Sequence, residues 1–245
     1  MKAAPWLLVA AGVISPGRRI ELEPAEARHA IGSLRLRPGD LVVVTDGAGV
    51  TASATLVDVR RGRADVEIGS VDRVARPSPG LTIAVGVLAG SAMDFVVQKS
   101  VELGVERVVP VSCARSQLGL ERAAARCEHW RRVGFQALKQ CRRPWAMEVA
   151  DPMSLPQVLH GVWSAGGVVA DPDGATPKTI SRDRCRCLLV GPEGGFDDDE
   201  LAAIRDAGWP SVRLGPHVLR AETAAIAGAA VVGWRVADGV HSADD

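Results

Sequence analysis

The sequence lacks tyrosine, long apolar runs and an excess of charge of either sign. Among its 245 residues, Lys+Arg number 29 and Asp+Glu number 29, so the formal net charge is zero. This balance argues against a protein that coats nucleic acid without specificity, although it leaves a local basic face open. Near the end, the longest apolar stretch covers residues 223–234, which is shorter than the roughly 18 residues a membrane-spanning helix needs. We therefore expect no segment that spans a membrane.

Cysteine is scarce as well. The 5 cysteines form no C-x-x-C pair and have no histidine at zinc-finger spacing. Their pattern argues against a disulfide framework and against structural zinc, so no metal is expected. At the start, Lys2 and the apolar residues 3–14 have the outline of a signal peptide, but Pro5 interrupts the apolar run. A first strand over residues 6–9 and a cytoplasmic location are the better interpretation.

The residues that are present can build a core and one or two domains. Apolar residues make up 47% of the chain and charged residues 24%, which excludes a disordered chain. Residues 41–44, 51–59 and 64–68 alternate apolar and polar side chains, which predicts a β-meander after a short helix over 24–36. Two prolines and a glycine in residues 76–80 end this β-rich part, and we place a domain boundary there.

After residue 80, strands alternate with helices. Such an alternation predicts a mostly parallel sheet covered by helices. The expected strands are 81–87, 107–111, 167–170, 187–190 and 212–214, and the expected helices are 92–103, 121–141, one from about 155, 198–207 and one from about 221.

Glycine occurs in a pattern that resembles a dinucleotide-binding fingerprint, Gly47-x-Gly49-x-x-Ala52. In a dinucleotide site this loop opens a helix, whose N-terminus holds the pyrophosphate. Here the alternating strand 51–59 follows instead. We therefore interpret the motif as a hairpin turn, which disfavours an NAD-dependent oxidoreductase.

A second glycine-rich loop, Gly191 to Phe196, lies between an apolar strand and a helix. Its glycines let backbone amides approach a ligand closely, but it lacks the Gly-Lys-Ser/Thr ending of a P-loop. The acidic residues 197–200 that follow are better read as a capping box, Asp197 with Glu200, than as a metal site.

Residues 214–224 form a further loop after a strand, and they open the last helix. Arg220 and Glu222 stand where this loop meets the helix, a favoured place for ligand contacts at the end of a parallel sheet. Because two glycine-containing loops follow neighbouring strands, one shared pocket is more plausible than two unrelated turns.

Three strings of residues resemble the sequences of a known protein family. Residues 29–40, which contain Leu34-Arg35-Leu36 and Pro38-Gly39-Asp40, resemble that family as well. The strings are Gln98-Lys99-Ser100-Val101-Glu102-Leu103-Gly104-Val105, Leu189-Val190-Gly191-Pro192-Glu193-Gly194-Gly195-Phe196, and Leu214-Gly215 through Leu219-Arg220-Ala221-Glu222-Thr223-Ala224. They resemble the RsmE family, methyltransferases of the SPOUT superfamily that use S-adenosylmethionine to methylate N3 of one uridine in 16S ribosomal RNA.

The resemblance implies an α/β fold, a SPOUT-type knotted parallel sheet with helices on both faces, plus an N-terminal PUA-like small β-barrel domain. Residues 1–76 would be the RNA-binding domain and residues 77–245 the methyltransferase domain, with a trefoil knot near residues 166–224. It also implies a homodimer and, as partner, 16S ribosomal RNA or the small ribosomal subunit.

By the same resemblance, Arg220 and Glu222 would be catalytic. The cofactor-binding residues would be Leu189, Val190, Gly191, Pro192, Glu193, Gly194, Gly195, Leu214, Gly215, Leu219, Arg220, Thr223 and Ala224, and the RNA-binding residues Arg35, Lys99, Arg115, Arg142 and Arg143. This sequence departs from the family at His217, where arginine is usual, at Lys139, where glutamate is usual, and in residues 1–9, which lack an arginine followed by aromatics.

Methylation at N3 requires no covalent intermediate, because the deprotonated imide nitrogen is itself the nucleophile. Positioning and stabilisation of charge on the flanking carbonyl oxygens should dominate, and the planar guanidinium of Arg220 suits that task. Glu222 would orient Arg220 or accept the proton. Methylation at C5 would instead need a cysteine nucleophile, for which Cys113 is the candidate by position.

RNA needs a local basic surface, and residues 115–143 supply one. This segment holds eight basic side chains against Glu121 and Glu128, so contact with phosphates is a reasonable expectation beside that of a solvated helix face. Two alternatives stay open: a SPOUT methyltransferase that acts on another RNA nucleotide, and a non-catalytic RNA-binding module. Intact glycine loops argue against the latter.

Overall fold

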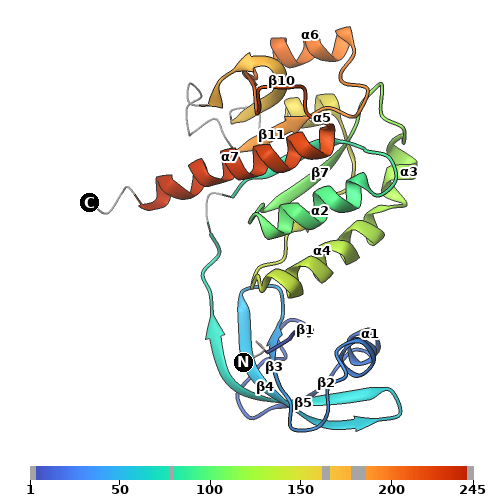
Figure 1. Cartoon of the computed structure of the whole chain (residues 1–245), viewed down its shortest axis with the longest axis vertical. Coiled ribbons are helices and arrows are strands. Elements are labelled where there is room, and N and C mark those ends of the chain that lie inside the picture. The colour runs from blue at the N-terminus through green and yellow to red at the C-terminus, as the bar shows by residue number, and fades with distance from the viewer. Residues whose placement is uncertain (1–3, 78–79, 162–165, 178–185, 242–245) are drawn as a thin grey trace. The chain divides into compact units, whose positions relative to one another are not determined.

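The structure is a computed structural model that describes residues 4–77, 80–161, 166–177 and 186–241, with side chains described up to residue 233 (Figure 1). The chain forms two compact units. The first unit contains Met1–Arg76 and Leu138–Ala146, and the second contains Pro77–Ala137 and Met147–Asp245. No helix in the described part of the chain has the length and apolar character needed to cross a membrane.

A five-stranded sheet forms the first unit. Its order is β1-β3-β4-β5-β2, with β1 parallel to β3 and the other pairs antiparallel. The predicted meander is confirmed, because alternate side chains of its strands, such as Val42, Val44 and Leu56, are buried in one core. The elements are β1 (Trp6–Leu8), β2 (Arg19–Glu21), α1 (Pro24–Arg28), a π-helical turn (His29–Ser33), β3 (Leu41–Thr45), β4 (Val50–Arg60) and β5 (Arg63–Arg73).

The Gly47–Gly49 motif is the hairpin turn between β3 and β4, as predicted. Gly49 has φ +91°, and a Cβ atom there would lie 2.3 Å from the ring of Trp145. The indole Nε1 of Trp145 in turn donates to the carbonyl oxygen of Val74 at 3.0 Å. Glycine is therefore needed for the backbone conformation and for the close approach of an aromatic ring, and no helix follows that would hold a dinucleotide.

Lys139, one of the departures from the family pattern, forms a buried ion pair with Glu26 inside the first unit. Its Nζ lies 2.9 Å from Glu26 Oε1 and 2.8 Å from Oε2, and both residues are only 8% exposed. Glu26 Oε1 also accepts the backbone N–H of Leu8 at 3.2 Å. This pair joins the end of α4 (Cys127–Cys141) to α1 and β1.

Replacing Lys139 with methionine should lower the free energy of unfolding by about 3 kcal/mol, because the Glu26 carboxylate stays buried without its cation. The double variant Glu26→Gln/Lys139→Met should recover most of that loss. Lys99→Met is the matched control: its ion pair with Glu102 is about one third exposed, so a loss below about 1 kcal/mol is expected. Urea denaturation measures all three, and equal losses in the single and double variants would contradict the prediction.

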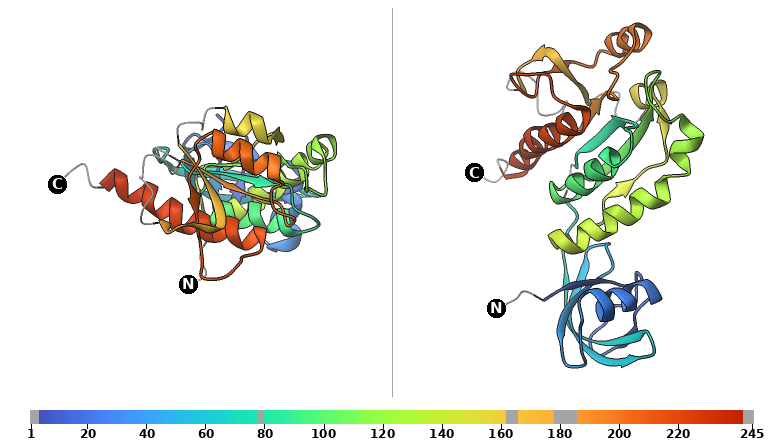
Figure 2. Two further views of the ribbon diagram at one scale, coloured as in Figure 1. Left: turned by 90° about the horizontal axis from the view of Figure 1, so that it is seen from above. Right: turned by 45° about the vertical axis from the view of Figure 1, so that its right-hand side comes forward.

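The second unit is a parallel sheet with helices on both faces, as predicted. Its order is β12-β10-β11-β6-β7-β8, with β9 also paired to β7. In Figure 2, α2 and α7 lie on one face of the sheet and α5 and α6 on the other. The elements are β6 (Thr82–Gly86), α2 (Ala92–Glu102), β7 (Arg107–Ser112), α3 (Leu120–Ala124), α4 (Cys127–Cys141), β8 (Glu148–Val149), β9 (Met153–Ser154), α5 (Leu155–Leu159), β10 (Gly167–Ala175), β11 (Cys187–Val190), α6 (Asp198–Asp206), β12 (Ser211–Val212) and α7 (Ala221–His241).

Two expectations about these elements were wrong. The predicted helix over 121–141 is two helices. The first ends where the N–H of Arg126 donates to the carbonyl oxygen of Ala123, three residues earlier, and helical bonding over four residues begins again where the N–H of Trp130 donates to the carbonyl oxygen of Arg126. Strand β10 continues to Ala175, five residues beyond the predicted end at Ala170. Its second half contains Asp171, Asp173 and Gly174, residue types that are unfavourable in strands.

Candidate functional site

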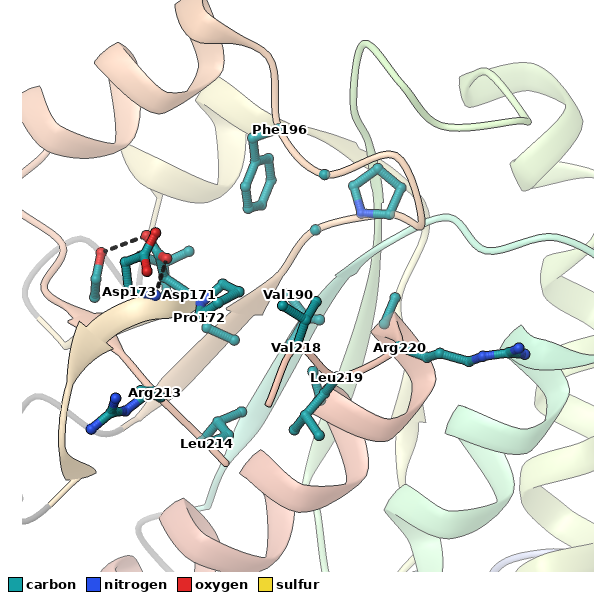
Figure 3. Close-up of a pocket in the computed structure, with 18 of the residues that line it drawn as sticks. Asp171, Pro172, Asp173, Val190, Phe196, Arg213, Leu214, Val218, Leu219 and Arg220 are labelled. Carbon is teal, nitrogen blue, oxygen red and sulfur yellow. Dashed lines mark hydrogen bonds between the residues drawn. The ribbon is translucent and has the colours of Figure 1, made fainter. Parts of the chain in front are cut away.

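A cavity of about 810 Å³ lies at the carboxyl ends of β10 and β11, in the second unit (Figure 3). Both loops predicted from the sequence border it, and so does the second half of β10. The shared pocket that the sequence predicted is therefore present. Open parallel sheets place ligands at such carboxyl ends, and the volume lies within the usual range for small-molecule sites.

The first loop follows β11 and is held in a tight turn. The N–H of Gly195 donates to the carbonyl oxygen of Pro192 at 2.8 Å, and Gly195 has φ +69°. Pro192 packs so closely on Gly86 that a Cβ atom at Gly86 would lie 2.5 Å from it. The carboxylate of Glu193 accepts the N–H of Ala89 at 2.9 Å. Contacts from the β6–α2 connection thus fix the loop beside the cavity.

The acids after this loop serve as helix caps. Asp197 accepts the N–H of Glu200 at 2.8 Å, and Glu200 accepts the N–H of Asp197 at 3.0 Å, which confirms the predicted capping box. The second oxygen of Glu200 accepts the N–H of Ala114 at 2.8 Å. These carboxylates are therefore committed to backbone donors.

The second loop supplies an apolar wall and leads into α7. Leu214 and Leu219 border the cavity together with Val190, and Val218 beside them is 80% exposed. Gly215 lies beside Leu219, and a Cβ atom there would be in ordinary contact with the Leu219 side chain at 3.5 Å. Opposite, Figure 3 shows Asp171, Asp173 and Arg213 on one side of the cavity.

Arg220 borders the cavity, but its guanidinium points away from the other labelled residues (Figure 3). The side chain is exposed, and within the described residues it has no hydrogen bond or ion pair. Glu222 also borders the cavity and likewise has no such partner there. The two side chains therefore do not form the simple ion pair that would reduce Arg220 to a structural role.

Most of the predicted cofactor residues border the cavity, with three exceptions. Leu189 is fully buried within the sheet, Gly194 packs against Arg115, and Thr223 is exposed on α7. Four further lining residues, Phe196, His217, Val218 and Ala221, belong to the two predicted loops. The wall formed by β10 and the residues near it was not predicted, although the rule that carboxyl ends of parallel strands meet could have found part of it. The cavity residues outside the predicted loops are Ala92, Val169, Ala170, Asp171, Pro172, Asp173, Leu201, Ile204, Arg205, Trp209, Ser211 and Arg213.

The predicted RNA-binding residues are in different environments. Arg35 and Arg142 are exposed, and both have left-handed backbone, with φ 57° and 60°. Arg143 is half-buried. Lys99 is paired with Glu102 at 2.8 Å. Arg115 donates to the carbonyl oxygens of Gly194 and Phe196 at 3.0 and 3.2 Å, so it contacts the first loop.

Cys113, the candidate nucleophile for C5 chemistry, is a buried thiol that does not border the cavity. Burial, together with the nearby charge of Glu200, raises the pKa of Cys113 to about 12. The thiol is therefore protonated at neutral pH, whereas the thiolate is the nucleophilic form. This environment does not support a covalent role for Cys113.

Comparison with known proteins places the chain among RNA methyltransferases. Residues 76–233 match a family model described as an RNA methyltransferase domain, and residues 22–69 match an RNA methyltransferase PUA domain. A protein of Mycobacterium tuberculosis named ribosomal RNA small subunit methyltransferase E is 30% identical over 85% of this chain and 83% of its own length. The Aquifex aeolicus protein of the same name is 36% identical, in a match that covers 55% of this chain and 59% of that protein.

Two solved structures have the same fold over nearly the whole chain. A ribosomal RNA small subunit methyltransferase E from Neisseria gonorrhoeae, bound to S-adenosyl methionine, has a TM-score of 0.84 and 29% identity and covers 95% of this chain and 98% of its own. A methyltransferase from Legionella pneumophila, described as putative and in complex with the cofactor SAM, has a TM-score of 0.85 with the same identity and coverage.

Proposed function

The chain belongs to the family of ribosomal RNA small subunit methyltransferase E proteins, and we propose from this that it transfers a methyl group from S-adenosylmethionine to N3 of one uridine in 16S ribosomal RNA. The observation that carries the proposal is the cavity that the two loops share, in a fold that matches the cofactor-bound Neisseria gonorrhoeae structure over 95% of this chain. Its location is proposed to be the cytoplasm, where ribosomal RNA is modified.

The cavity suits S-adenosylmethionine by size and by chemistry. Val190, Leu214 and Leu219 offer an apolar wall to the adenine ring, and the glycine loop offers backbone groups at close range. Asp173 and Arg213 carry opposite charges at one side of the cavity, which suits the ammonium and carboxylate groups of the methionine part. Bound there, the cofactor would supply an activated methyl group on its sulfonium.

The protein's own part in the reaction is to orient the uracil and to manage its N3 proton. We assign charge stabilisation to Arg220, whose exposed guanidinium is free of partners in the described residues and can reach a substrate group outside the cavity. Glu222 borders the cavity near it and is our candidate acceptor of the proton. Neither role needs a cysteine nucleophile.

For RNA, we propose that residues 1–76 form the binding domain and residues 77–245 the methyltransferase domain, and that Arg35 and Arg142 contact phosphates. Both side chains are exposed and without ion-pair partners in the part of the chain that is described. The left-handed backbone of each arginine follows the end of a helical segment, where the next residue bonds back to the last turn, Leu36 N–H to Ala30 and Arg143 N–H to Leu138. The assignment to RNA therefore rests on the exposure of the two side chains.

A homodimer and the trefoil knot near residues 166–224 are proposed from family membership. The dimer is supported by apolar side chains on the outside of two neighbouring helices: Phe95 of α2 is 45% exposed and Val231 of α7 is 37% exposed. Ala225, Ala229 and Val232 of α7 are buried against the sheet. Sedimentation equilibrium at micromolar concentration measures the state, and an active monomer would contradict the dimer.

The proposed reaction predicts 3-methyluridine as the product. Purified protein is incubated with S-adenosylmethionine and small ribosomal subunits from a strain that lacks the gene, and the 16S ribosomal RNA is digested and analysed by mass spectrometry. A mass increase of one methyl group on a single uridine, with the fragmentation of an N3-methylated base, is expected. Methylation of another atom or nucleotide would support a different SPOUT specificity, and RNA binding without methyl transfer would support a binding module.

A further inference from the structure

The strongest unassigned feature is a side-chain connection between the turn after β7 and the loop that borders the cavity. Arg115 lies in this turn, 79 positions before Gly194 in the sequence. Its Nη1 donates to the carbonyl oxygen of Gly194 at 3.0 Å and to that of Phe196 at 3.2 Å. One nitrogen of the guanidinium thus holds two peptide groups of the same loop.

A second contact joins the turn to the start of α6, and the turn is again the donor, but here a backbone N–H meets a side-chain acceptor. Glu200, in the first turn of α6, accepts the N–H of Ala114 at 2.8 Å. Its other oxygen accepts the N–H of Asp197 at 3.0 Å. Ser116 makes the turn itself compact, since its hydroxyl accepts the N–H of Cys113 at 3.1 Å. Arg115 is therefore presented to the loop by a turn that is anchored on both sides.

The contact fixes the conformation of the turn that borders the cavity. In a planar peptide, holding the Gly194 carbonyl also fixes the direction of the Gly195 N–H, which donates to Pro192 at 2.8 Å, so Arg115 supports the same tight turn from its other side. Phe196 also borders the cavity, and its ring packs so near Gly191 that a Cβ atom there would lie 3.2 Å away. Gly194 lies against Arg115, where an added Cβ atom would be 3.0 Å from the Arg115 Cβ.

We propose that Arg115 is a positioning residue that holds the 191–196 loop in its ligand-binding conformation, and that it acts on cofactor affinity rather than on RNA affinity. This inference rests on the proposed function for the identity of the ligand, S-adenosylmethionine. It revises the expectation, drawn from sequence, that Arg115 contacts RNA. Arginine suits the role because Nη1 carries two N–H groups, one for each carbonyl oxygen, on a planar group that stays charged.

The test measures two affinities in the same set of variants. Arg115→Ala should weaken S-adenosylmethionine binding about tenfold by calorimetry, because the loop must be ordered without its charged donor. Its affinity for 16S ribosomal RNA should stay within twofold of wild type at both low and moderate salt. Arg115→Lys should restore part of the cofactor affinity.

Arg142→Gly is the matched control, with the reverse expectation. It removes an exposed arginine from the same basic segment, and glycine tolerates the φ of 60° found there. RNA affinity should fall and its salt dependence should become shallower, while cofactor affinity stays unchanged. Melting temperatures, recorded for every variant, separate these effects from a loss of folding.

Two outcomes would overturn the inference. Weakened, less salt-dependent RNA binding by Arg115→Ala with unchanged cofactor affinity would make Arg115 an RNA contact. A lowered melting temperature with unchanged cofactor affinity would make it a structural residue only. Failure of the wild-type protein to bind S-adenosylmethionine would instead contradict the proposed function, so the two failures are distinguishable.

Discussion

Replacing Gly195 with valine is expected to weaken S-adenosylmethionine binding by at least about thirtyfold. Gly195 has φ +69°, and its N–H closes the turn to Pro192 at 2.8 Å. A β-branched residue at such a φ costs roughly 2 kcal/mol or more, which corresponds to about that loss if the loop relaxes to avoid the strain. The relaxed loop no longer offers its backbone groups to the cavity. Isothermal titration calorimetry of the variant with the cofactor measures the effect.

Gly12→Val is the control, because it introduces the same backbone strain at a glycine that has no role in binding. Gly12 has φ +77°, and a Cβ atom there would have no neighbour within 4 Å, as at Gly195. Gly12 belongs to the first unit and does not border the cavity. This variant should lose stability in denaturation to a similar extent but keep its cofactor affinity. Equal cofactor affinities in Gly195→Val and wild type would remove the loop from the cofactor site.

Arg220→Lys should lower the rate of methyl transfer about a hundredfold in a single turnover, with cofactor affinity unchanged. The guanidinium points away from the cavity wall and has no partner among the described side chains, so its loss leaves the cofactor's surroundings intact. Stabilisation of the negative charge that develops on the uracil oxygens is lost, and removing one such donor typically costs about 10²–10³ in rate. Lysine keeps the charge but not the planar fork.

Arg213→Lys provides the comparison. Arg213 is also exposed and borders the cavity, on the side opposite to Arg220 in Figure 3. With saturating cofactor and RNA, its single-turnover rate should stay within about threefold of wild type, because it faces the proposed methionine part and not the uracil. A wild-type rate in Arg220→Lys would remove Arg220 from the chemical step. Equal losses in both variants would show that any change of charge geometry at the cavity slows the reaction.

The sequence by itself determined the features that depend on a few neighbouring residues. Strand β11 has the predicted bounds Cys187–Val190, and α7 begins at the predicted Ala221. The capping box of Asp197 and Glu200 and the hairpin turn at Gly47–Gly49 were predicted as the structure has them. Apolar periodicity, capping residues and glycines act within one turn or one strand, so their effect can be read from adjacent positions. Alternation of strands and helices also predicted the parallel sheet, because parallel neighbours require crossover helices.

Only the tertiary structure decided which distant residues meet. Asp171 and Asp173 continue β10 against their intrinsic preference, in an irregular stretch between the β12 pairings of Ala170 and Ala175, where the N–H of Asp173 donates to Asp171 Oδ1 at 2.8 Å. This stretch brings a further wall to the cavity. Arg115 was assigned to RNA from the charge of its segment, yet its donors reach carbonyl oxygens of a loop 79 and 81 positions later. Lys139 belongs with Glu26, 113 positions earlier, and this pair holds the end of α4 in the first unit. A periodic pattern carries no information about such pairs, because long-range contacts form where the folded elements pack and not where the sequence repeats.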